Sequence, residues 1–538
     1  MDLGVSRAGG GTSRTVAVVG GGIAGLAAAW ELTGGSAGPG PSTPRVVVLE
    51  AADRVGGKIR TESFEGGPVD LGPDGFLGRR PEAADLCREL GLSEALRPIG
   101  TAGAAVFARG RRRPLPDGLF VGIPTRFWPV ARSGVLGPKG SLRLLLDVVA
   151  PRPDSRGPLG DRAVGPLVAR KLGGRVVEVL VDPLMGGIHA GGVGDMSTAA
   201  SYPLLLALAQ RRGSFMRSLR QALARGAAGA PVAATDDGDG DGDHGDSADD
   251  ADGGDAPATE APLFYSLEGG LERLTDRLAA VLAERDVEIR TESPVELLDR
   301  TGPGWVLHTP EGPVVADGLV LALPASGAAA LLEGHDAEAG RLLAGIEYAS
   351  VSVLTFAFSD GVVPTDELYG TGLLVPHGTA VPARRSDGDD PVGVFSDDDS
   401  FLVTACTYLS QKWPHLERPG SVLIRASVGR ADDERAAVLS DAQLVERVLA
   451  ELRILLGVAG RPQASAVTRW KGAFPQYRVH HLLRVTGIES ALRRLPATAV
   501  AGASYRGVGI PACVASGRAA ATTVLDAMAE QPSEAGPG

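Results

Sequence analysis

The sequence has little cysteine, few aromatic residues and no long apolar run, and each shortage excludes a class of protein. Three cysteines in 538 residues cannot form a disulfide framework or a zinc cluster. No stretch reaches the roughly 20 continuous apolar residues of a transmembrane helix, since the longest candidate, Leu319–Leu332, contains a proline and a glycine. Met1–Arg14 has no apolar core of a secretory signal. We therefore expect a cytoplasmic protein without a metal site.

The net charge of −12 is unevenly distributed along the chain. Between Arg79 and Arg175 there are 18 Lys or Arg against 8 Asp or Glu, whereas Thr235–Glu260 contains ten Asp, one Glu and almost nothing apolar. The acidic segment cannot bury enough surface to offset the entropy of ordering, so we expect a disordered loop. Asp and Gly alternate there as in a calcium loop, but the Glu at loop position 12 and the flanking amphipathic helices of an EF-hand are missing.

A glycine-rich turn near the N-terminus lies between two short β-branched runs. Thr15–Val19 is followed by Gly20-Gly21-Gly22-Ile23-Ala24-Gly25, and Leu26–Leu32 is typical of a helix. The second run, Arg45–Leu49, ends at Glu50. Strand, turn, helix and strand in this order are the context that a dinucleotide-binding fingerprint requires.

The residues of this fingerprint have separate roles. Gly20 permits the tight turn, Gly22 lets the backbone approach the pyrophosphate, and Gly25 lets the helix pack closely against the strand. The carboxylate of Glu50 can accept hydrogen bonds from the ribose hydroxyls. Gly34–Pro44 lengthens the usual spacing to this acid, and we interpret it as a tolerated surface insertion.

The loop after this acid favours FAD over NAD. It reads Glu50-Ala51-Ala52-Asp53-Arg54-Val55-Gly56-Gly57-Lys58. Such a loop brings backbone N–H groups and one or two cations to the pyrophosphate, which suits a cofactor that is kept rather than exchanged. The string is similar to the signature of the flavoprotein amine-oxidase and phytoene-desaturase superfamily.

Periodicity predicts the other elements of an α/β chain. The expected helices are Pro81–Leu90, Ser141–Val149, Leu271–Glu284, Asp441–Leu456 and Pro511–Met528. The expected strands are Val287–Arg290, a meander of Val295–Leu298, Trp305–His308 and Val314–Leu323, then Val351–Phe358, Phe401–Thr407, Val422–Val428 and Ala499–Ala501. A chain of this length exceeds one hydrophobic core, so we expect several domains.

Further motifs narrow the resemblance to the protoporphyrinogen and coproporphyrinogen oxidases. Asp70-Leu71-Gly72-Pro73-Asp74-Gly75-Phe76 resembles their flavin-contacting segment. The motifs similar to the Gram-positive branch, which forms coproporphyrin III, are Lys412-Trp413-Pro414-His415, Val428–Glu434, Thr468-Arg469-Trp470, Pro475-Gln476-Tyr477 and Gly502–Pro511. The resemblance extends from about Thr15 to Met528, without the acidic segment.

This resemblance implies an FAD-binding Rossmann-like fold of the GR2, amine-oxidase-like type. We expect a discontinuous FAD domain (14–95, 263–325 and 471–529), a mainly helical, basic insert (96–205), a helix end with the acidic loop (206–262), and a substrate domain with a mixed sheet (326–470). The implied FAD contacts are Gly20, Gly21, Gly22, Ile23, Ala24, Gly25, Glu50, Ala51, Arg54, Gly57, Lys58, Gly72, Pro73, Asp74, Gly75, Val295, Trp470, Val508, Gly509 and Ile510.

The substrate implied by the resemblance is a porphyrinogen, whose propionates call for an apolar pocket with a few Arg at its rim. Arg80 aligns with a basic residue of the Gram-positive enzymes. For the run Arg109–Arg113 we favour a solvated turn. The chain departs from the family at His189, where the family motif has Tyr, and at Ser427, where the Bacillus-type enzyme has Tyr. His189 is a candidate general base, but a role in helix packing is favoured.

The implied reaction transfers a hydride from a tetrapyrrole meso carbon to flavin N5, with loss of the adjacent N–H proton. Dioxygen then reoxidises the flavin and gives hydrogen peroxide. Three cycles would aromatise the macrocycle. Because aromatisation drives the reaction, the enzyme mainly needs orientation and a dry pocket, so we assign no catalytic residue. We expect no nucleic-acid partner, leave peripheral membrane contact open, and derive no oligomeric state.

Other interpretations stay open at this point. A protoporphyrinogen IX oxidase would share these motifs, and an amine oxidase or carotenoid desaturase would share the fold. An amine oxidase favours an aromatic cage and often a Cys for covalent flavin attachment, but the C-terminal turn offers Tyr505 and no Cys, since Cys513 lies in the following helix. A non-catalytic carrier like the Rab GDP-dissociation inhibitors would lack the complete C-terminal flavin turn.

Overall fold

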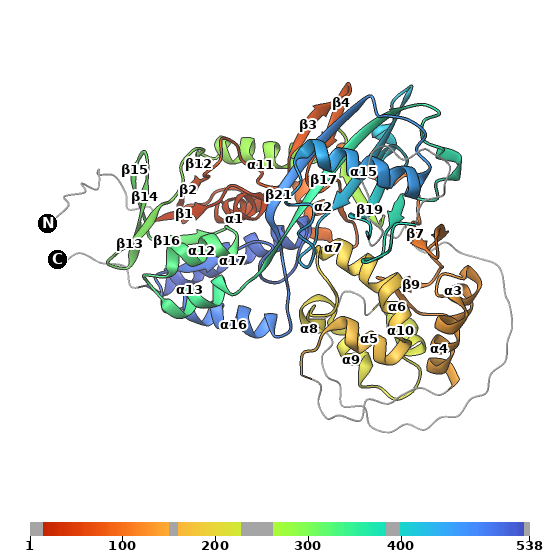
Figure 1. Ribbon diagram of the computed structural model, residues 1–538. Coiled ribbons are helices and arrows are strands. Elements are labelled where there is room, and N and C mark those ends of the chain that lie inside the picture. The colour runs from red at the N-terminus through yellow and green to blue at the C-terminus, as the bar shows by residue number, and fades with distance from the viewer. Residues whose placement is uncertain (1–13, 150–159, 227–261, 383–398, 532–538) are drawn as a thin grey trace, which may run out of the picture.

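The computed structural model describes residues 14–149, 160–226, 262–382 and 399–531. The acidic segment Thr235–Glu260, for which a disordered loop is expected, lies outside these residues. Figure 1 shows an α/β part, a second part built on a large sheet, and a helical part below that sheet. This combination confirms the predicted fold class.

A parallel five-stranded sheet forms the centre of the α/β part. Its order is β12 (Glu288–Arg290), β2 (Arg45–Leu49), β1 (Thr15–Val19), β16 (Gly318–Leu321) and β22 (Thr498–Val500). Alternate residues face opposite sides of such a sheet. Val16, Val18 and Val48 enter one core, and Ala17 and Leu319 enter another, so both faces are covered.

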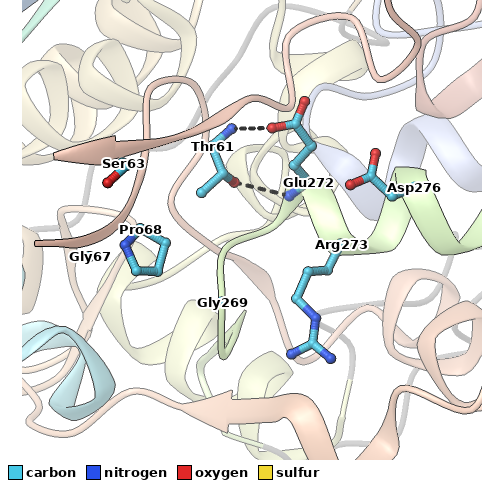
Figure 2. Close-up of a pocket in the computed structure, with 8 residues that line it drawn as sticks. All are labelled: Thr61, Ser63, Gly67, Pro68, Gly269, Glu272, Arg273 and Asp276. Atoms are coloured by element: carbon cyan, nitrogen blue, oxygen red, sulfur yellow. Dashed lines mark hydrogen bonds between the residues drawn. The ribbon is translucent and has the colours of Figure 1, made fainter.

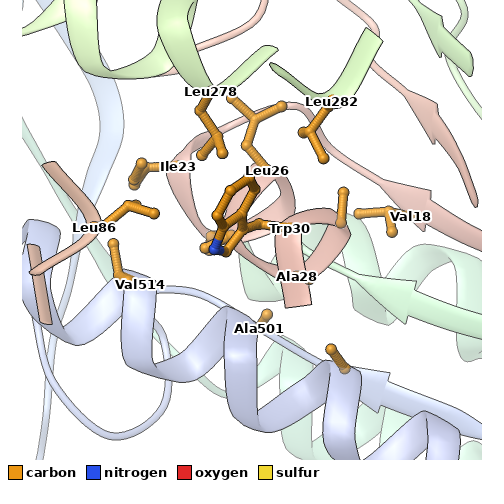
Figure 3. Packing of buried hydrophobic residues seen from close by; sticks show 14 of the residues in the cluster. Val18, Ile23, Leu26, Ala28, Trp30, Leu86, Leu278, Leu282, Ala501 and Val514 are labelled. Atoms are coloured by element: carbon orange, nitrogen blue, oxygen red, sulfur yellow. The ribbon is translucent and has the colours of Figure 1, made fainter. Parts of the chain in front are cut away.

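One face of this sheet packs against helices from distant parts of the sequence. They are α1 (Ile23–Leu32), α2 (Pro81–Glu89), α11 (Glu272–Glu284) and α17 (Ile510–Glu530). Figure 3 shows Trp30 and Leu26 of α1 surrounded by Leu278 and Leu282 of α11 and by Val514 of α17. A Cβ on Gly517 of α17 would lie 2.1 Å from the carbonyl oxygen of Ala24, so the two helices pack with their backbones close together.

The other face carries an antiparallel meander and three helices. These are β13 (Leu297–Thr301), β14 (Gly304–Thr309), β15 (Gly312–Ala316), α12 (Ala325–Leu332), α13 (Ala337–Ala344) and α16 (His481–Leu492). The prediction of one strand over Val314–Leu323 is wrong, because β15 ends at Ala316 and β16 begins in the parallel sheet at Gly318. Asp317 makes the junction: its N–H donates to Thr15 O at 2.7 Å and its carboxylate accepts from Thr15 N at 2.8 Å.

The second part is a mixed seven-stranded sheet with α15 (Asp441–Leu456) packed on it. Its order is β21 (Ala464–Pro475), β17 (Tyr348–Ser359), β20 (Ser421–Val428), β19 (Val403–Tyr408), β18 (Gly372–Leu374), β7 (Ala105–Ala108) and β8 (Arg111–Pro114). The prediction of a solvated turn over Arg109–Arg113 is wrong for most of its length. The turn is confined to Arg109 and Gly110, while Arg112 in β8 donates to Glu367 at 2.7 Å and to Leu456 O at 2.9 Å.

The helical part has its own core of aliphatic side chains. It contains α3 (Phe127–Ser133), α4 (Gly137–Val149), α5 (Val164–Leu172), α6 (Gly174–Val176), the π-helix η3 (Val177–Gly186), α7 (Gly187–His189), α8 (Thr198–Ser201), α9 (Pro203–Ala209) and α10 (Phe215–Ala224). Among the described residues, no helix is long and apolar enough to cross a membrane.

Short elements connect these parts. They are η1 (Gly35–Ala37), β3 (Thr61–Phe64), β4 (Gly67–Asp70), β5 (Phe76–Leu77), η2 (Ser93–Ala95), β6 (Leu96–Pro98), β9 (Leu119–Phe120), β10 (Ile123–Pro124), β11 (Phe264–Leu267), η4 (Thr365–Glu367), α14 (Leu409–Lys412) and η5 (Pro414–Leu416).

Candidate cofactor and substrate site

The glycine-rich turn after β1 has the close contacts that a dinucleotide fingerprint needs. Gly20 has φ +105°, and a Cβ there would lie 2.5 Å from Ala322 O. A Cβ on Gly25 would lie 1.9 Å from Gly20 O, so the start of α1 is pressed against the turn. A Cβ on Gly22, by contrast, would meet nothing within 4 Å. The open space at this glycine is where the fingerprint expects the pyrophosphate.

Glu50 lies beside the same turn, at the carboxyl end of the neighbouring strand β2. Its Oε2 accepts from the N–H of Gly21 at 2.6 Å and its Oε1 from the N–H of Ala52 at 2.9 Å. The N–H of Ser293 donates to Glu50 O at 2.8 Å. The half-buried Val295 follows Ser293 by two residues. Glu50 and the segment that leads to Val295 therefore meet at the carboxyl end of β2, where the sequence interpretation expects the ribose and the adenine.

The loop 51–58 returns to the glycine-rich turn. The N–H of Gly56 donates to Gly21 O at 2.8 Å, and Gly22 and Gly56 form a parallel bridge. Arg54 donates to the loop's own carbonyls at Val55, Ile59 and Gly57 and pairs with Glu272 at 3.0 Å. The cation expected near the pyrophosphate therefore holds the loop together in this structure.

Lys58 connects this loop to the large sheet. Its Nζ donates to Ala473 O of β21 at 2.7 Å, and burial lowers the pKa of its ammonium group. A Cβ on Gly72 would lie 1.9 Å from Lys58 O, so only glycine fits where the segment 70–75 crosses the loop. Lys58 is exposed as a residue, so its ammonium group can exchange this carbonyl for an anionic group that binds at the same place.

The structure brings two other sequence motifs into contact with the segment 70–75. Trp470 donates from Nε1 to Leu71 O at 2.9 Å. Lys412 and Trp413 donate to Oδ2 of Asp74 at 2.8 and 3.1 Å. Burial alone would raise the pKa of Asp74, but the charges of Lys412 and Arg425 and these hydrogen bonds outweigh it, and the pKa lies well below its usual value.

Arg425 is a buried charged residue at this site that the sequence interpretation missed. It lies in β20 with only 5% of its surface exposed and donates to Gly72 O at 2.8 Å and to Asp70 O. A single arginine within the apolar run 422–426 is the signal that could have identified it, because a buried charge requires partners. Burial also raises the pKa of Asp70 to about 6, although Thr61 and Leu271 hydrogen bond to its carboxylate.

The C-terminal turn leads into α17. Gly507 and Gly509 have φ +148° and +94°, and Gly509 is the N-cap of the helix. Val508 is half-buried and Ile510 is buried. Arg80, predicted as a substrate contact, lies next to this turn, since its Nη1 is 3.7 Å from a Cβ built on Gly507, and it pairs with Glu82 at 2.7 Å.

The two positions that depart from the family lie in different surroundings. His189 is 7% exposed between the rings of Tyr202 and Tyr477, its Nδ1 has no partner among the described residues, and burial lowers its pKa to about 4. This geometry favours packing over a general base. Ser427 is half-buried in β20, between Val353 of β17 and Ala405 of β19.

Two open pockets lie elsewhere on the described surface. Figure 2 shows the first, of about 380 Å³, where Thr61 and Glu272 are joined by hydrogen bonds of 2.8 and 3.2 Å. The second, of about 560 Å³, lies between α15 and the start of β21. None of the predicted cofactor residues lines either of these two pockets. Among the described residues, no group of three or more acidic, His or Cys side chains could hold a metal ion.

Comparisons with known proteins cover nearly the whole chain. A family model described as flavin containing amine oxidoreductase matches residues 23–525. A coproporphyrinogen III oxidase from Bacillus subtilis (strain 168) is 30% identical over 95% of this chain and 97% of the relative. One from Propionibacterium freudenreichii subsp. freudenreichii is 34% identical over 96% of this chain and 92% of the relative. A solved structure from Exiguobacterium sp. 255-15, assigned as a protoporphyrinogen oxidase, has TM-score 0.77 at 30% identity and covers 97% of this chain and 100% of that one.

Proposed function

The chain belongs to the flavin-containing amine oxidoreductase family and is an oxidoreductase, and we propose that it oxidises coproporphyrinogen III to coproporphyrin III in heme biosynthesis, with FAD as cofactor and dioxygen as acceptor. One observation carries the proposal. The Lys412-Trp413 motif, similar to the Gram-positive oxidases, contacts Asp74 of the flavin-contacting segment, so motifs 338 residues apart meet at one site. We place the enzyme in the cytoplasm.

The residues present fit FAD. Glu50, fixed by the N–H of Gly21, would hold the ribose, and the space at Gly22, at the N-terminus of α1, leaves room for the pyrophosphate. Lys58 would bind a phosphate oxygen or the flavin edge once its bond to Ala473 O is exchanged. The segment 72–75, Trp470 and the turn at Val508 would surround the isoalloxazine. When bound, FAD supplies a two-electron acceptor for hydride.

The protein's own contribution is orientation and exclusion of water. Arg425, Lys412 and Trp413 fix the segment 70–75 through bonds to its carbonyl groups and to Asp74. A segment held in this way offers the macrocycle a preorganised surface. We assign no acid–base residue to the loss of the pyrrolic proton, which accompanies a strongly favourable aromatisation.

Substrate charge favours coproporphyrinogen III, which has four propionates where protoporphyrinogen IX has two. Arg80 lies at the flavin turn, and the stretch 79–175 has 18 cationic against 8 acidic side chains. Such a positive field attracts carboxylates within about 8–10 Å at physiological salt. Protoporphyrinogen IX oxidation is the second candidate, favoured by the solved neighbour from Exiguobacterium.

Steady-state rates with both porphyrinogens test the proposal. We expect a higher kcat/KM for coproporphyrinogen III, an advantage that decreases as salt rises, and one hydrogen peroxide per two electrons removed. Equal or reversed preference at low salt would replace the proposal by a protoporphyrinogen oxidase, and no turnover with either substrate would remove both.

We also propose peripheral contact with an anionic membrane through α3 and α4. Their large exposed apolar residues are Trp128, Leu142, Leu146, Val148 and Val149. The exposed cations beside them are Arg126, Arg132 and Lys139, while the single acid of residues 126–149, Asp147, is buried at the N-terminus of α10. Apolar side chains among cations without exposed acids suit an anionic lipid surface.

A further inference from the structure

The segment Gln476–His481 connects the helical part of the protein to the C-terminal turn. On the helical side, Tyr477 O accepts from the N–H of Ser197 at 2.7 Å, and Gln476 donates from Nε2 to His189 O at 2.9 Å. The first bond fixes the backbone at Tyr477 and the second holds the side chain of Gln476, so the segment is anchored to the helical part.

On the other side, one hydroxyl bridges the turn. The O–H of Tyr477 donates to Ala503 O at 2.6 Å and accepts from the N–H of Gly507 at 2.8 Å. Its single donor and one of its acceptor positions are thus both used. The two backbone groups lie on either side of Ser504–Arg506, so the hydroxyl closes the turn that leads into Gly509 and α17.

A histidine supports the same contact. The rings of Tyr477 and His481 are stacked, with centroids 3.9 Å apart and an interplanar angle of 14°. Nε2 of His481 lies 2.8 Å from Tyr505 O, and burial lowers its pKa to about 4, so the neutral ring carries its proton on Nε2 and donates it. Tyr348 contacts the turn independently, with its hydroxyl 2.6 Å from Ser504 Oγ.

We propose that Tyr477 is a positioning residue that holds the turn Gly502–Gly509 in its flavin-binding conformation. Gly502, Gly507 and Gly509 all have positive φ, and glycines of this kind have many alternative conformations when nothing constrains them. Without the tyrosyl hydroxyl, FAD binding would have to order the turn and would be weaker. The inference rests on the proposed function, since it requires that this turn contacts FAD.

The test compares Tyr477→Phe with Tyr505→Phe. Both remove a hydroxyl from a buried tyrosine at this turn, but the hydroxyl of Tyr505 has no partner among the described residues. We expect the Kd of the apoprotein for FAD to rise about tenfold in Tyr477→Phe, or about 1.4 kcal/mol, and to stay within about twofold in Tyr505→Phe. The midpoint potential of the bound flavin should shift only in Tyr477→Phe, a change that a merely structural role would not produce.

The outcomes are distinct. Equal FAD affinity in wild type and Tyr477→Phe, or equal losses in both variants, would overturn the inference while the proposed function stands. A wild-type protein that binds no FAD would overturn the proposed function itself. If Tyr477→Phe does not fold, hydrogen exchange on the wild-type flavoprotein decides: the Gly507 amide should exchange at least about tenfold more slowly than in a freely exposed chain, and an unprotected amide would overturn the inference.

Discussion

At the scale of single residues, the charged groups of the site mainly bind other groups of the protein. Asp74 is neutralised by Lys412, Arg54 binds the carbonyls of its own loop, and Arg425 holds two carbonyls of the segment 70–75. What remains for a dinucleotide is mainly backbone N–H groups and apolar surface. Such a site is ordered before binding, which suits a cofactor that stays bound.

Replacement of Arg80 by Ala should affect the tetracarboxylate more than the dicarboxylate. The Arg80 side chain is 44% exposed and its guanidinium pairs with Glu82, so a contact with a propionate would be partly screened. We expect KM for coproporphyrinogen III to rise about two- to fivefold and KM for protoporphyrinogen IX to rise less. Arg79→Ala, an exposed neighbour with the same charge change, is the control. Identical effects of the two variants would argue against a specific contact.

His189→Phe separates packing from catalysis. A general base would be worth at least about 100-fold in rate, whereas we expect kcat to stay within about threefold. The folded pKa of about 4 lies below the ordinary 6.5, so the neutral histidine contributes stability above about pH 6.5 that is lost as pH falls toward 4. The difference in melting temperature, variant minus wild type, should therefore increase as the pH is lowered from neutral to about 5. A large drop in kcat would restore the general-base hypothesis.

A contact between two residues can be predicted from the sequence where both residues follow neighbouring strands of one sheet. Glu50 and Gly21 follow two adjacent parallel strands, so their meeting could be predicted from order alone. Arg425 and Tyr477 could not be identified in this way. Their partners lie 353 and 30 residues away, and their roles depend on how β20 and the end of β21 cross other segments.

At the scale of elements, the first turn of the fingerprint offers a matched pair of glycine substitutions. Gly22→Ala places a methyl group in open space, so the apoprotein should keep its melting temperature but lose FAD affinity by at least about tenfold. Gly25→Ala places a methyl 1.9 Å from Gly20 O and should destabilise the apoprotein itself by about 1–3 kcal/mol. Dialysis followed by thermal unfolding measures both. Unchanged flavin retention in Gly22→Ala would contradict the assigned pyrophosphate position.

Hydrophobic periodicity in the sequence predicts some of the helices and strands but not all of them. The strands Thr15–Val19 and Arg45–Leu49 and the helix Asp441–Leu456 are confirmed with their bounds. The run 314–323 is apolar except at Asp317 and Gly318 but belongs to two sheets, and Asp317, bonded to Thr15, lies at the break. The helix α16 was not predicted, and its exposed Leu483 shows why: its apolar residues do not keep to one face.

At the scale of the whole molecule, the helical part and the large sheet are joined by charged groups of the motif 428–434. Arg430 is 8% exposed and pairs with Asp182 of the π-helix at 3.0 Å, and the N–H of Ala431 donates to Ala190 O at 2.9 Å. A buried pair of this kind orients its two elements, since removal of either partner leaves an unpaired charge. The motif therefore joins the helical part to the large sheet, a role that its resemblance to other oxidases did not indicate.

Vesicle binding tests the exposed face of α3 and α4. The protein should bind vesicles with phosphatidylglycerol, bind phosphatidylcholine vesicles more weakly, and dissociate as salt rises. Leu142→Ser should weaken binding about tenfold, since a 64% exposed leucine can insert without loss of core packing. Leu483→Ser, 70% exposed on α16, should have no effect. Equal binding by both variants, or no preference for anionic lipid, would remove the membrane proposal.

The most direct test of porphyrinogen oxidation by a bound flavin is a single anaerobic turnover with the purified protein. Coproporphyrinogen III is mixed with the protein without dioxygen, and flavin absorbance is followed together with porphyrin fluorescence. We expect the oxidised-flavin absorbance to disappear on mixing and to return when air is admitted, with fluorescent coproporphyrin III as product, and protoporphyrinogen IX to react more slowly at low salt. Flavin that stays oxidised with both porphyrinogens, or a preparation without flavin, would contradict this expectation.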